Sequence, residues 1–149
     1  MIESKNSVAG EVTHVVAAII WQPGKDHRFL ISKRQKGKHL EGFWELPGGK
    51  IEPGESRRQA LDRELREEID IVPVKVRGFK QVSHQYEDRN IFLDVWEVAS
   101  FKGNVSAREG QELKWIAIDE LGRYQFPEAD VPVIQAIANI ATVKKEHRA

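Results

Sequence analysis

Three glutamates, Glu64, Glu67 and Glu68, are spaced by three and four residues in a segment with the pattern of a helix. This spacing places their side chains on one helical face. Like charges on one face repel each other and weaken the helix, so a strongly positive partner would offset the cost. Hard carboxylate oxygens suit Mg²⁺ or Mn²⁺, which commonly bridge to a substrate phosphate. The spacing therefore predicts a divalent metal site that works on phosphate.

The segment that carries these glutamates reads as a glycine turn followed by an amphipathic helix. The turn is expected at Gly48-Gly49. Ser56 is a suitable N-cap for the helix, and Gln59, three residues later, completes a capping-box pattern. Apolar residues at helical spacing predict the buried stripe, which consists of Ala60, Leu61, Leu65 and Ile69.

Strands come in runs in the rest of the chain, with one further main helix. Apolar or alternating segments predict strands at Val12–Trp21, Phe29–Lys33, Val74–Val82, Asn90–Val98 and Leu113–Ile118. The first two are expected to be joined by a turn at residues 23–26, and the next two to form a long antiparallel pair. Val131–Val143 predicts the second helix, with Pro132 in its first turn. This order favours an α+β sheet with flanking helices over a strict βαβ repeat.

Composition limits the class of protein. The chain has 149 residues, so we expect one domain over residues 1–149, with flexible tails at about 1–10 and 144–149. The formal net charge of zero argues against a stable nucleic-acid partner. Cysteine is absent, which excludes disulfides and thiolate metal sites. The longest apolar run, Val15–Trp21, is too short to span a bilayer, and we expect a cytoplasmic monomer or weak dimer without membrane contact.

Written as spacing, residues 49–71 read G-x5-E-x7-R-E-U-x-E-E-x-D-U, where U is a bulky aliphatic residue. The pattern resembles the Nudix box, with Asp70 where the usual form has glycine. The resemblance extends to the MutT branch of that family through Ser32–Arg34, His39, Trp44–Lys50, Asp88-Arg89, Arg108–Gln111 and Phe126–Asp130. It implies an α/β/α sandwich with a mixed β-sheet and two main helices.

The resemblance also implies roles for the charged residues of the box. Glu67 and Glu68 are expected to bind the metal. Glu64 is expected to bind it too or to act as the base that deprotonates the attacking water. The family pattern adds a ligand from the backbone carbonyl of Gly48. It also implies a structural ion pair between Arg63 and Glu55, and a distal glutamate, Glu109, that completes metal binding or assists as base.

Nucleotide contacts are expected outside the box. Arg34 and His39 resemble residues that contact the phosphate and sugar region, and Arg89 resembles a further contact. The segment Glu45, Leu46, Pro47 and Gly48 is expected to line the pocket beside the base or sugar, and Phe126 belongs to the same set by resemblance.

Asp130 stands where the MutT pattern has an asparagine that contacts the purine. An amide offers a donor and an acceptor, which complements the ring N–H and carbonyl edge of 8-oxoguanine. An ionised carboxylate has only acceptors and suits an exocyclic amino group, as on cytosine or adenine, unless burial keeps it protonated. A related Nudix branch that acts on CTP and modified deoxycytidine or adenine nucleotides resembles this chain in carrying Asp-x-Pro here. The alternative is a purely structural role as N-cap of the last helix.

Asp70 departs from the family glycine that ends the catalytic helix. A left-handed conformation is often required there, and aspartate tolerates it better than most residues. Its charge also lies at the negative end of the helix dipole. We expect a modest loss of stability relative to glycine and no effect on chemistry.

The reaction predicted by these residues is Mg²⁺-dependent, with Mn²⁺ as a possible substitute. A nucleoside triphosphate, ribo or deoxy, and water give the monophosphate and pyrophosphate. The expected role is removal of 8-oxo-dGTP from the nucleotide pool, which protects replication fidelity. The alternative substrate is CTP or a modified dCTP. A dinucleotide or ADP-ribose pyrophosphatase and a non-catalytic Nudix-like binding module are the remaining candidates.

Overall fold

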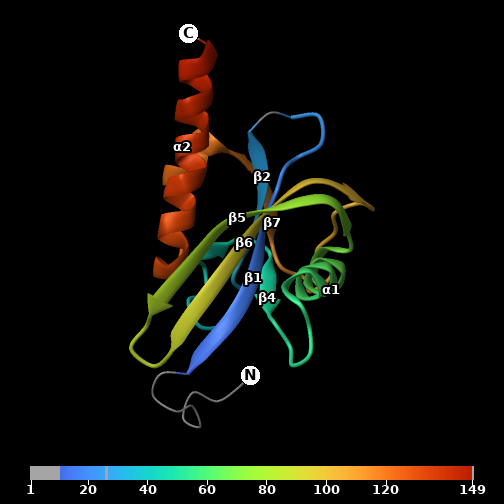
Figure 1. Cartoon of the computed structure of the whole chain (residues 1–149), viewed down its shortest axis with the longest axis vertical. Coiled ribbons are helices and arrows are strands. Elements are labelled where there is room, and N and C mark those ends of the chain that lie inside the picture. The colour runs from blue at the N-terminus through green and yellow to red at the C-terminus, as the bar shows by residue number, and fades with distance from the viewer. Residues whose placement is uncertain (1–10, 26, 149) are drawn as a thin grey trace.

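Two sheets and two main helices build the part of the chain that the computed structural model describes, residues 11–25 and 27–148 (Figure 1). The four-stranded sheet has the order β4-β1-β6-β5, and the three-stranded sheet has the order β3-β2-β7. The helices α1 and α2 lie on opposite sides of the larger sheet (Figure 1). The predicted α+β sandwich with a mixed sheet and two main helices is confirmed.

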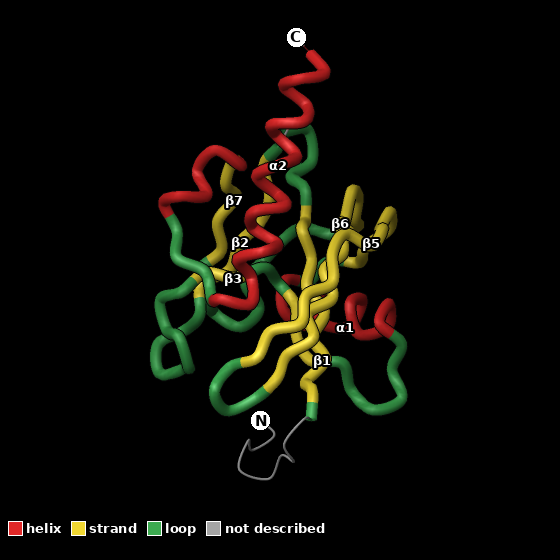
Figure 2. Tube along the Cα trace, turned by 60° about the vertical axis from the view of Figure 1, so that its left-hand side comes forward, coloured by secondary structure: helices red, strands yellow, loops and turns green. Residues whose placement is uncertain are grey.

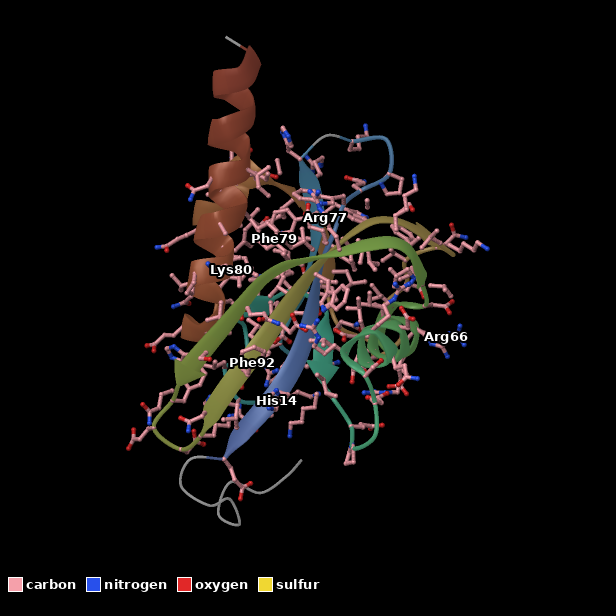
Figure 3. The ribbon with its side chains drawn as sticks, in the orientation of Figure 1. His14, Arg66, Arg77, Phe79, Lys80 and Phe92 are labelled. Atoms are coloured by element: carbon pink, nitrogen blue, oxygen red, sulfur yellow. The ribbon has the colours of Figure 1, made fainter. Side chains whose placement is uncertain are left out.

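The larger sheet is centred on two strands that are far apart in the sequence. The strand β1 (Val12–Ile20) pairs in parallel with β6 (Asn90–Lys102) along its whole length. His14 and Phe92 face each other in this register, with ring centroids 5.5 Å apart (Figure 3). On the other edge of β6 runs β5 (Val72–Gln85), antiparallel and bulged, so the predicted long antiparallel pair is present.

Two expectations about the first strands are wrong. Residues 48–50 form the short strand β4 (Gly48–Lys50), antiparallel to β1, where a glycine turn was expected. The strand β2 (Arg28–Lys33) does not pair with β1 as a hairpin, apart from one bridge between Trp21 and Phe29. Both edges of β1 are occupied by β4 and β6, so β2 joins β3 (Trp44–Glu45) and β7 (Leu113–Ala117) instead. Figure 2 shows these three strands grouped beside α2, apart from β1, β5 and β6.

The helix α1 (Arg57–Ile69) begins and ends as its sequence dictates. Ser56 accepts a hydrogen bond from the Gln59 N–H, and the Gln59 side chain accepts one from the Ser56 N–H, so the capping box is confirmed. Asp70 ends the helix in the left-handed conformation, with φ of 62°. Arg66, on the outer side of α1, points away from the sheet into solvent (Figure 3).

Side chains of β1 alternate between two core clusters, which explains how one strand supports both layers. Val16, Ala18 and Ile20 pack with the apolar stripe of α1. Ala17 and Ile19 face the other cluster, which includes Val133 and Ile137 of α2 (Val131–Arg148). The helix continues beyond the expected end at Val143, so residues 144–148, predicted as a tail, are helical, while residues 1–10 and 149 lie outside the described residues.

Two short 3₁₀ helices precede α2: η2 (Ile118–Arg123) and η3 (Glu128–Asp130). The second matters most for the site, because it brings Asp130 next to the end of β5. Tyr86, which follows β5, accepts a hydrogen bond from the Ala129 N–H through its hydroxyl (3.0 Å).

Candidate active site

A cavity of about 710 Å³ opens between β1, β4, the loop after β2, the β5–β6 turn and η3. Most of the predicted nucleotide contacts line it, namely Arg34, His39, Glu45, Leu46, Gly48, Arg89 and Asp130. Tyr86 and Lys38 also line it and were not singled out from the sequence. The volume is in the range of pockets that bind small ligands such as nucleotides.

Pro47 and Phe126 do not line this cavity, contrary to expectation. Pro47 is buried, and its carbonyl accepts a hydrogen bond from the Ala18 N–H (2.9 Å), so it extends the contact between β4 and β1. Phe126 packs against the core cluster on the α2 side. An aromatic ring next to a buried apolar cluster gains more from packing there than from solvent contact.

The wall of the cavity near β4 adjoins a cluster of carboxylates. Glu68 is buried, and one of its oxygens accepts a hydrogen bond from the Gly48 N–H (3.2 Å). Burial, with added repulsion from Glu45, Glu109 and Glu64, raises the pKa of Glu68 to about 8. Burial also raises the pKa of Glu64, against the opposing effect of its neighbour Arg63.

This electrostatic crowding fits a divalent cation, which would relieve the repulsion and favour the ionised carboxylates. Glu68 is repelled by Glu45, Glu109 and Glu64, and Glu64 is repelled by Glu67 and Glu109. Among the side chains that the structure describes, those of residues 11–25 and 27–140, no three acidic or histidine residues stand close enough to enclose one ion. Mg²⁺ in proteins commonly keeps several waters and takes ligands from substrate phosphates, so it needs few protein ligands.

Glu67 behaves differently from the other two glutamates of the helix. Its side chain is 59% exposed and pairs with Arg63 (3.2 Å) one turn earlier. The three carboxylates are therefore not equivalent: Glu64 and Glu68 face the β4 side of the helix, and Glu67 lies at its solvent edge.

Arg63 connects the parts of the box. Its guanidinium donates to both oxygens of Glu55 (2.6 and 3.0 Å), to the Lys50 carbonyl (2.9 Å) and to Glu64 (2.9 Å). The hydrogen bond from Arg63 lowers the pKa of Glu55, and the same contact raises the pKa of Arg63. The expected contact between Arg63 and Glu55 is thus present, and it ties the glycine-containing loop to α1.

Arg34 is held at the rim of the cavity by two contacts. Its Nε donates to the His39 carbonyl (3.0 Å), and its Nη1 lies 3.4 Å from Glu45. Burial raises the pKa of Glu45, and Arg34 opposes that shift. His39 itself is exposed and lines the cavity, as does Arg89, whose carbonyl accepts a hydrogen bond from the Tyr86 N–H (2.8 Å).

Asp130, at the end of η3, also lines the cavity. Burial, together with repulsion from Glu45, raises the pKa of Asp130 to about 7, while Arg34 lowers it. Among the described residues, no backbone N–H donates to this carboxylate, so the geometry of a helix N-cap is not seen. Its oxygens are available to a ligand in the cavity.

Comparison with known proteins agrees with this architecture. A model of the NUDIX domain matches residues 16–136. The CTP pyrophosphohydrolase of Escherichia coli K12 is 42% identical over 128 residues, which cover 85% of this chain and 91% of that protein. The 8-oxo-dGTP diphosphatase of the same organism is 34% identical over 116 residues, or 78% of this chain and 90% of that protein.

Solved structures give the same result. A MutT chain from work on the Aliivibrio salmonicida and Vibrio cholerae proteins superimposes with a TM-score of 0.76 and 39% identity, covering 87% of this chain and 98% of that one. The E. coli ORF135 protein gives a TM-score of 0.76 with 36% identity, covering 89% and 93%. The chain therefore belongs to the Nudix family. Within that family it is a MutT-like hydrolase. None of its described helices is both long and apolar enough to cross a membrane.

Proposed function

We propose that this Nudix hydrolase converts CTP, or a modified deoxycytidine triphosphate, and water to the monophosphate and pyrophosphate. The observation that carries the choice of base is the Asp130 carboxylate, which lines the cavity and receives no hydrogen bond from the described residues. The exocyclic amino group of cytosine supplies the donor that this acceptor lacks. The 42% identity to a CTP pyrophosphohydrolase supports the same choice over the 8-oxo-dGTP reading expected first.

The carboxylate cluster would supply the metal site for this reaction. Glu64, Glu68, Glu109 and the Gly48 carbonyl would hold Mg²⁺ or Mn²⁺, with Glu67 at the solvent edge. A bound ion would screen the charge of the triphosphate and activate a water for attack on phosphorus. Glu64 or Glu109 would accept the proton of that water as general base.

The remaining residues would bind and orient the nucleotide. Arg34, held by Glu45 and the His39 carbonyl, presents a cation to the sugar and phosphate region. Arg89 and His39 line the cavity on either side and would contact the same part of the ligand. Arg63, fully engaged by Glu55, Glu64 and the Lys50 carbonyl, would orient the metal-binding helix without contacting the substrate.

Two observations favour a second substrate, 8-oxo-dGTP. The 8-oxo-dGTP diphosphatase of E. coli is 34% identical to this chain, and the pKa of Asp130, raised to about 7 by burial, leaves part of the acid neutral at physiological pH. A neutral acid has one donor and one acceptor, which complements the carbonyl and ring N–H of 8-oxoguanine.

Steady-state kcat/KM on CTP, dCTP, 5-methyl-dCTP, dGTP and 8-oxo-dGTP separates these possibilities. We expect the highest value for a cytosine nucleotide, with pyrophosphate rather than orthophosphate as product. A preference for 8-oxo-dGTP would overturn the cytosine assignment. Absence of Mg²⁺-dependent hydrolysis of every nucleotide would instead support a binding module.

A further inference from the structure

The backbone N–H and the backbone carbonyl of Glu109 are each hydrogen-bonded to a glutamine side chain. The Glu109 N–H donates to Oε1 of Gln111 (3.0 Å), and the Glu109 carbonyl accepts from Nε2 of Gln35 (2.8 Å). Gln111 uses its other end as well, since its Nε2 donates to the Glu68 carbonyl (3.0 Å). The Gln111 side chain thus bridges the backbones of two residues of the carboxylate cluster.

Gln111 has the environment of a structural connector rather than of a surface residue. It is only 7% exposed, and the bonds to Glu109 and Glu68 use both the donor and the acceptor of its amide. A buried amide that lost either partner would leave an unsatisfied polar group, which is costly. This geometry therefore fixes the spacing between the backbones of Glu109 and Glu68.

Further backbone contacts bring the same loop to the end of α1. The Arg108 N–H donates to the Glu68 carbonyl (3.1 Å), and the Ser106 N–H donates to the Ile69 carbonyl (3.0 Å). Gln35 adds a connection to the loop after β2, because it directly follows Arg34 at the cavity rim. The Gly110 N–H also donates to the Ala107 carbonyl (3.2 Å), so the two glutamines supply the hydrogen bonds to the N–H and carbonyl of Glu109 itself within a loop that is already held at its neighbours.

We infer that Gln111, assisted by Gln35, is a positioning residue that sets the Glu109 carboxylate against Glu64 and Glu68 so that the three act on one metal ion. The inference rests on the proposed function, because it requires Glu109 to belong to the metal site. The repulsion that Glu109 exerts on Glu64 and Glu68 is consistent with this placement.

A double-mutant cycle tests the inference, with kcat at saturating Mg²⁺ and nucleotide as the measurement. Gln111→Ala should lower kcat roughly 10- to 100-fold, as expected for loss of a residue that orients a metal ligand, with little change in KM. Glu109→Gln should lower it at least as much. The double variant should be no slower than Glu109→Gln alone, because Gln111 acts through Glu109. Losses that multiply in the double variant would overturn the inference.

Two readouts do not depend on turnover. Amide hydrogen exchange in the metal-free protein should become faster at Glu109 in Gln111→Ala. Mn²⁺ affinity, measured by water-proton relaxation, should fall in Gln111→Ala and in Glu109→Gln. In the double variant the two losses of affinity should not multiply. Unchanged Mn²⁺ affinity in Gln111→Ala would count against the inference.

Matched variants keep the outcome interpretable. Glu112→Gln changes an exposed neighbour that pairs only loosely with Lys33 (3.9 Å) and should leave kcat and Mn²⁺ binding as in the wild type. If Gln111→Ala does not fold, Gln35→Ala can replace it in the double-mutant cycle. This variant lies in a partly exposed loop and removes the hydrogen bond to the Glu109 carbonyl, and the expected loss of kcat is smaller.

Wild-type kcat in Glu109→Gln would overturn the inference while leaving the proposed reaction intact. A wild-type protein that hydrolyses no nucleotide would refute the reaction, and the Mn²⁺ arm would still decide the inference.

Discussion

Glu64 of α1 lies against Gly49 of β4 so closely that a β-carbon on Gly49 would overlap all three atoms of the Glu64 carboxyl group. The glycine is therefore required for space, so that a strand backbone can lie directly beneath a carboxylate of the site. Gly48 is constrained from the other side, since a β-carbon there would run into the backbone of Val16 and Ala17 in β1.

Replacing Gly49 by alanine should therefore displace the Glu64 carboxylate while leaving most of the fold in place. We expect Gly49→Ala to lower kcat roughly 100-fold, since misplacing a reacting group by about 1 Å has that effect. Gly48→Ala should instead destabilise the protein by about 2 kcal/mol or more, because the backbone of β1 cannot move to make room for the added β-carbon. Thermal denaturation and kcat together distinguish the two. Gly122→Ala, whose added carbon meets no atom within 4 Å, is the control, and wild-type kcat in Gly49→Ala would contradict the argument.

Exchange of the carboxyl group of Asp130 for an amide should change base preference. Asn at this position offers a donor beside an acceptor, which matches the carbonyl and ring N–H of 8-oxoguanine better than a carboxylate does. In Asp130→Asn the ratio of kcat/KM for CTP to that for 8-oxo-dGTP should fall by about tenfold or more. Glu128→Gln, two residues away with a 79% exposed side chain, should leave the ratio unchanged. An unchanged ratio in Asp130→Asn would remove Asp130 from base recognition.

The same residue should make base preference depend on pH. Because burial raises the pKa of Asp130 to about 7, the acid is mostly neutral at pH 6 and mostly ionised at pH 8. A carbonyl of the base needs the neutral acid as donor, whereas the amino group of cytosine is accepted by either form. The CTP to 8-oxo-dGTP ratio of kcat/KM should rise between pH 6 and pH 8 in the wild type. In Asp130→Asn this ratio should not change with pH, since the amide does not titrate. The measurement is therefore the pH profile of the ratio in the wild type compared with that in Asp130→Asn.

Glu68 should make the metal-free protein less stable as pH rises. Its pKa in the fold, raised to about 8, exceeds the ordinary value of 4.5, so between these values the folded state binds more protons than the unfolded chain. Stability from this group is full below pH 4.5 and is lost as pH rises through 8. In chelator, the Tm of the wild type should fall by roughly 5 °C or more from pH 5 to pH 8.5.

Glu68→Gln should flatten that fall, although Asp130, Glu64 and Glu45, whose pKa values are shifted in the same direction, leave a residual slope. Addition of Mg²⁺ should restore the wild-type Tm at pH 8.5 and have less effect on Glu68→Gln. An identical pH dependence in the wild type and Glu68→Gln would refute the burial of an ionising carboxyl group at this position.

Replacing Asp70 by the glycine of the family pattern should stabilise the protein. Its φ of 62° is easier for glycine, while its carboxylate gains only an exposed contact with Arg108 (3.3 Å). Asp70→Gly should raise Tm by about 1–3 °C with unchanged kcat, a gain below about 1 kcal/mol. Arg108→Gln measures the value of the lost contact separately. A large change in kcat for Asp70→Gly would give this residue a direct part in the reaction.

Features that depend on near neighbours could be predicted from the sequence. The capping box of Ser56 and Gln59, the left-handed Asp70 and the contact between Arg63 and Glu55 all follow from spacing along one helix and its entry loop. The three glutamates were expected to share one face, but successive residues of a helix are about 100° apart, so the burial of Glu68 leaves its neighbour Glu67 at the solvent edge, where it pairs with Arg63.

Features set by distant segments could not be predicted in the same way. Strand patterns locate β1 and β2 but not their partners, since pairing is decided by which edges β4 and β6 occupy. Gln111 carries no sequence signal beyond its place in a resembling segment, because its two partners lie on different elements. Phe126 and Pro47 occur in such segments too, yet they pack inward.

The parallel pairing of β1 with β6 has a consequence for how the protein folds. Residue 12 faces residue 90 and residue 20 faces residue 98, so the centre of the sheet closes a loop of about 80 residues. Contacts of such long sequence separation slow folding relative to helical proteins of similar length. During synthesis, β1 lacks its parallel neighbour until β6 has emerged. A helix of 13 residues such as α1 is only marginally stable without tertiary packing, so the carboxylates that it carries gain fixed positions against the cavity when this last central strand is in place.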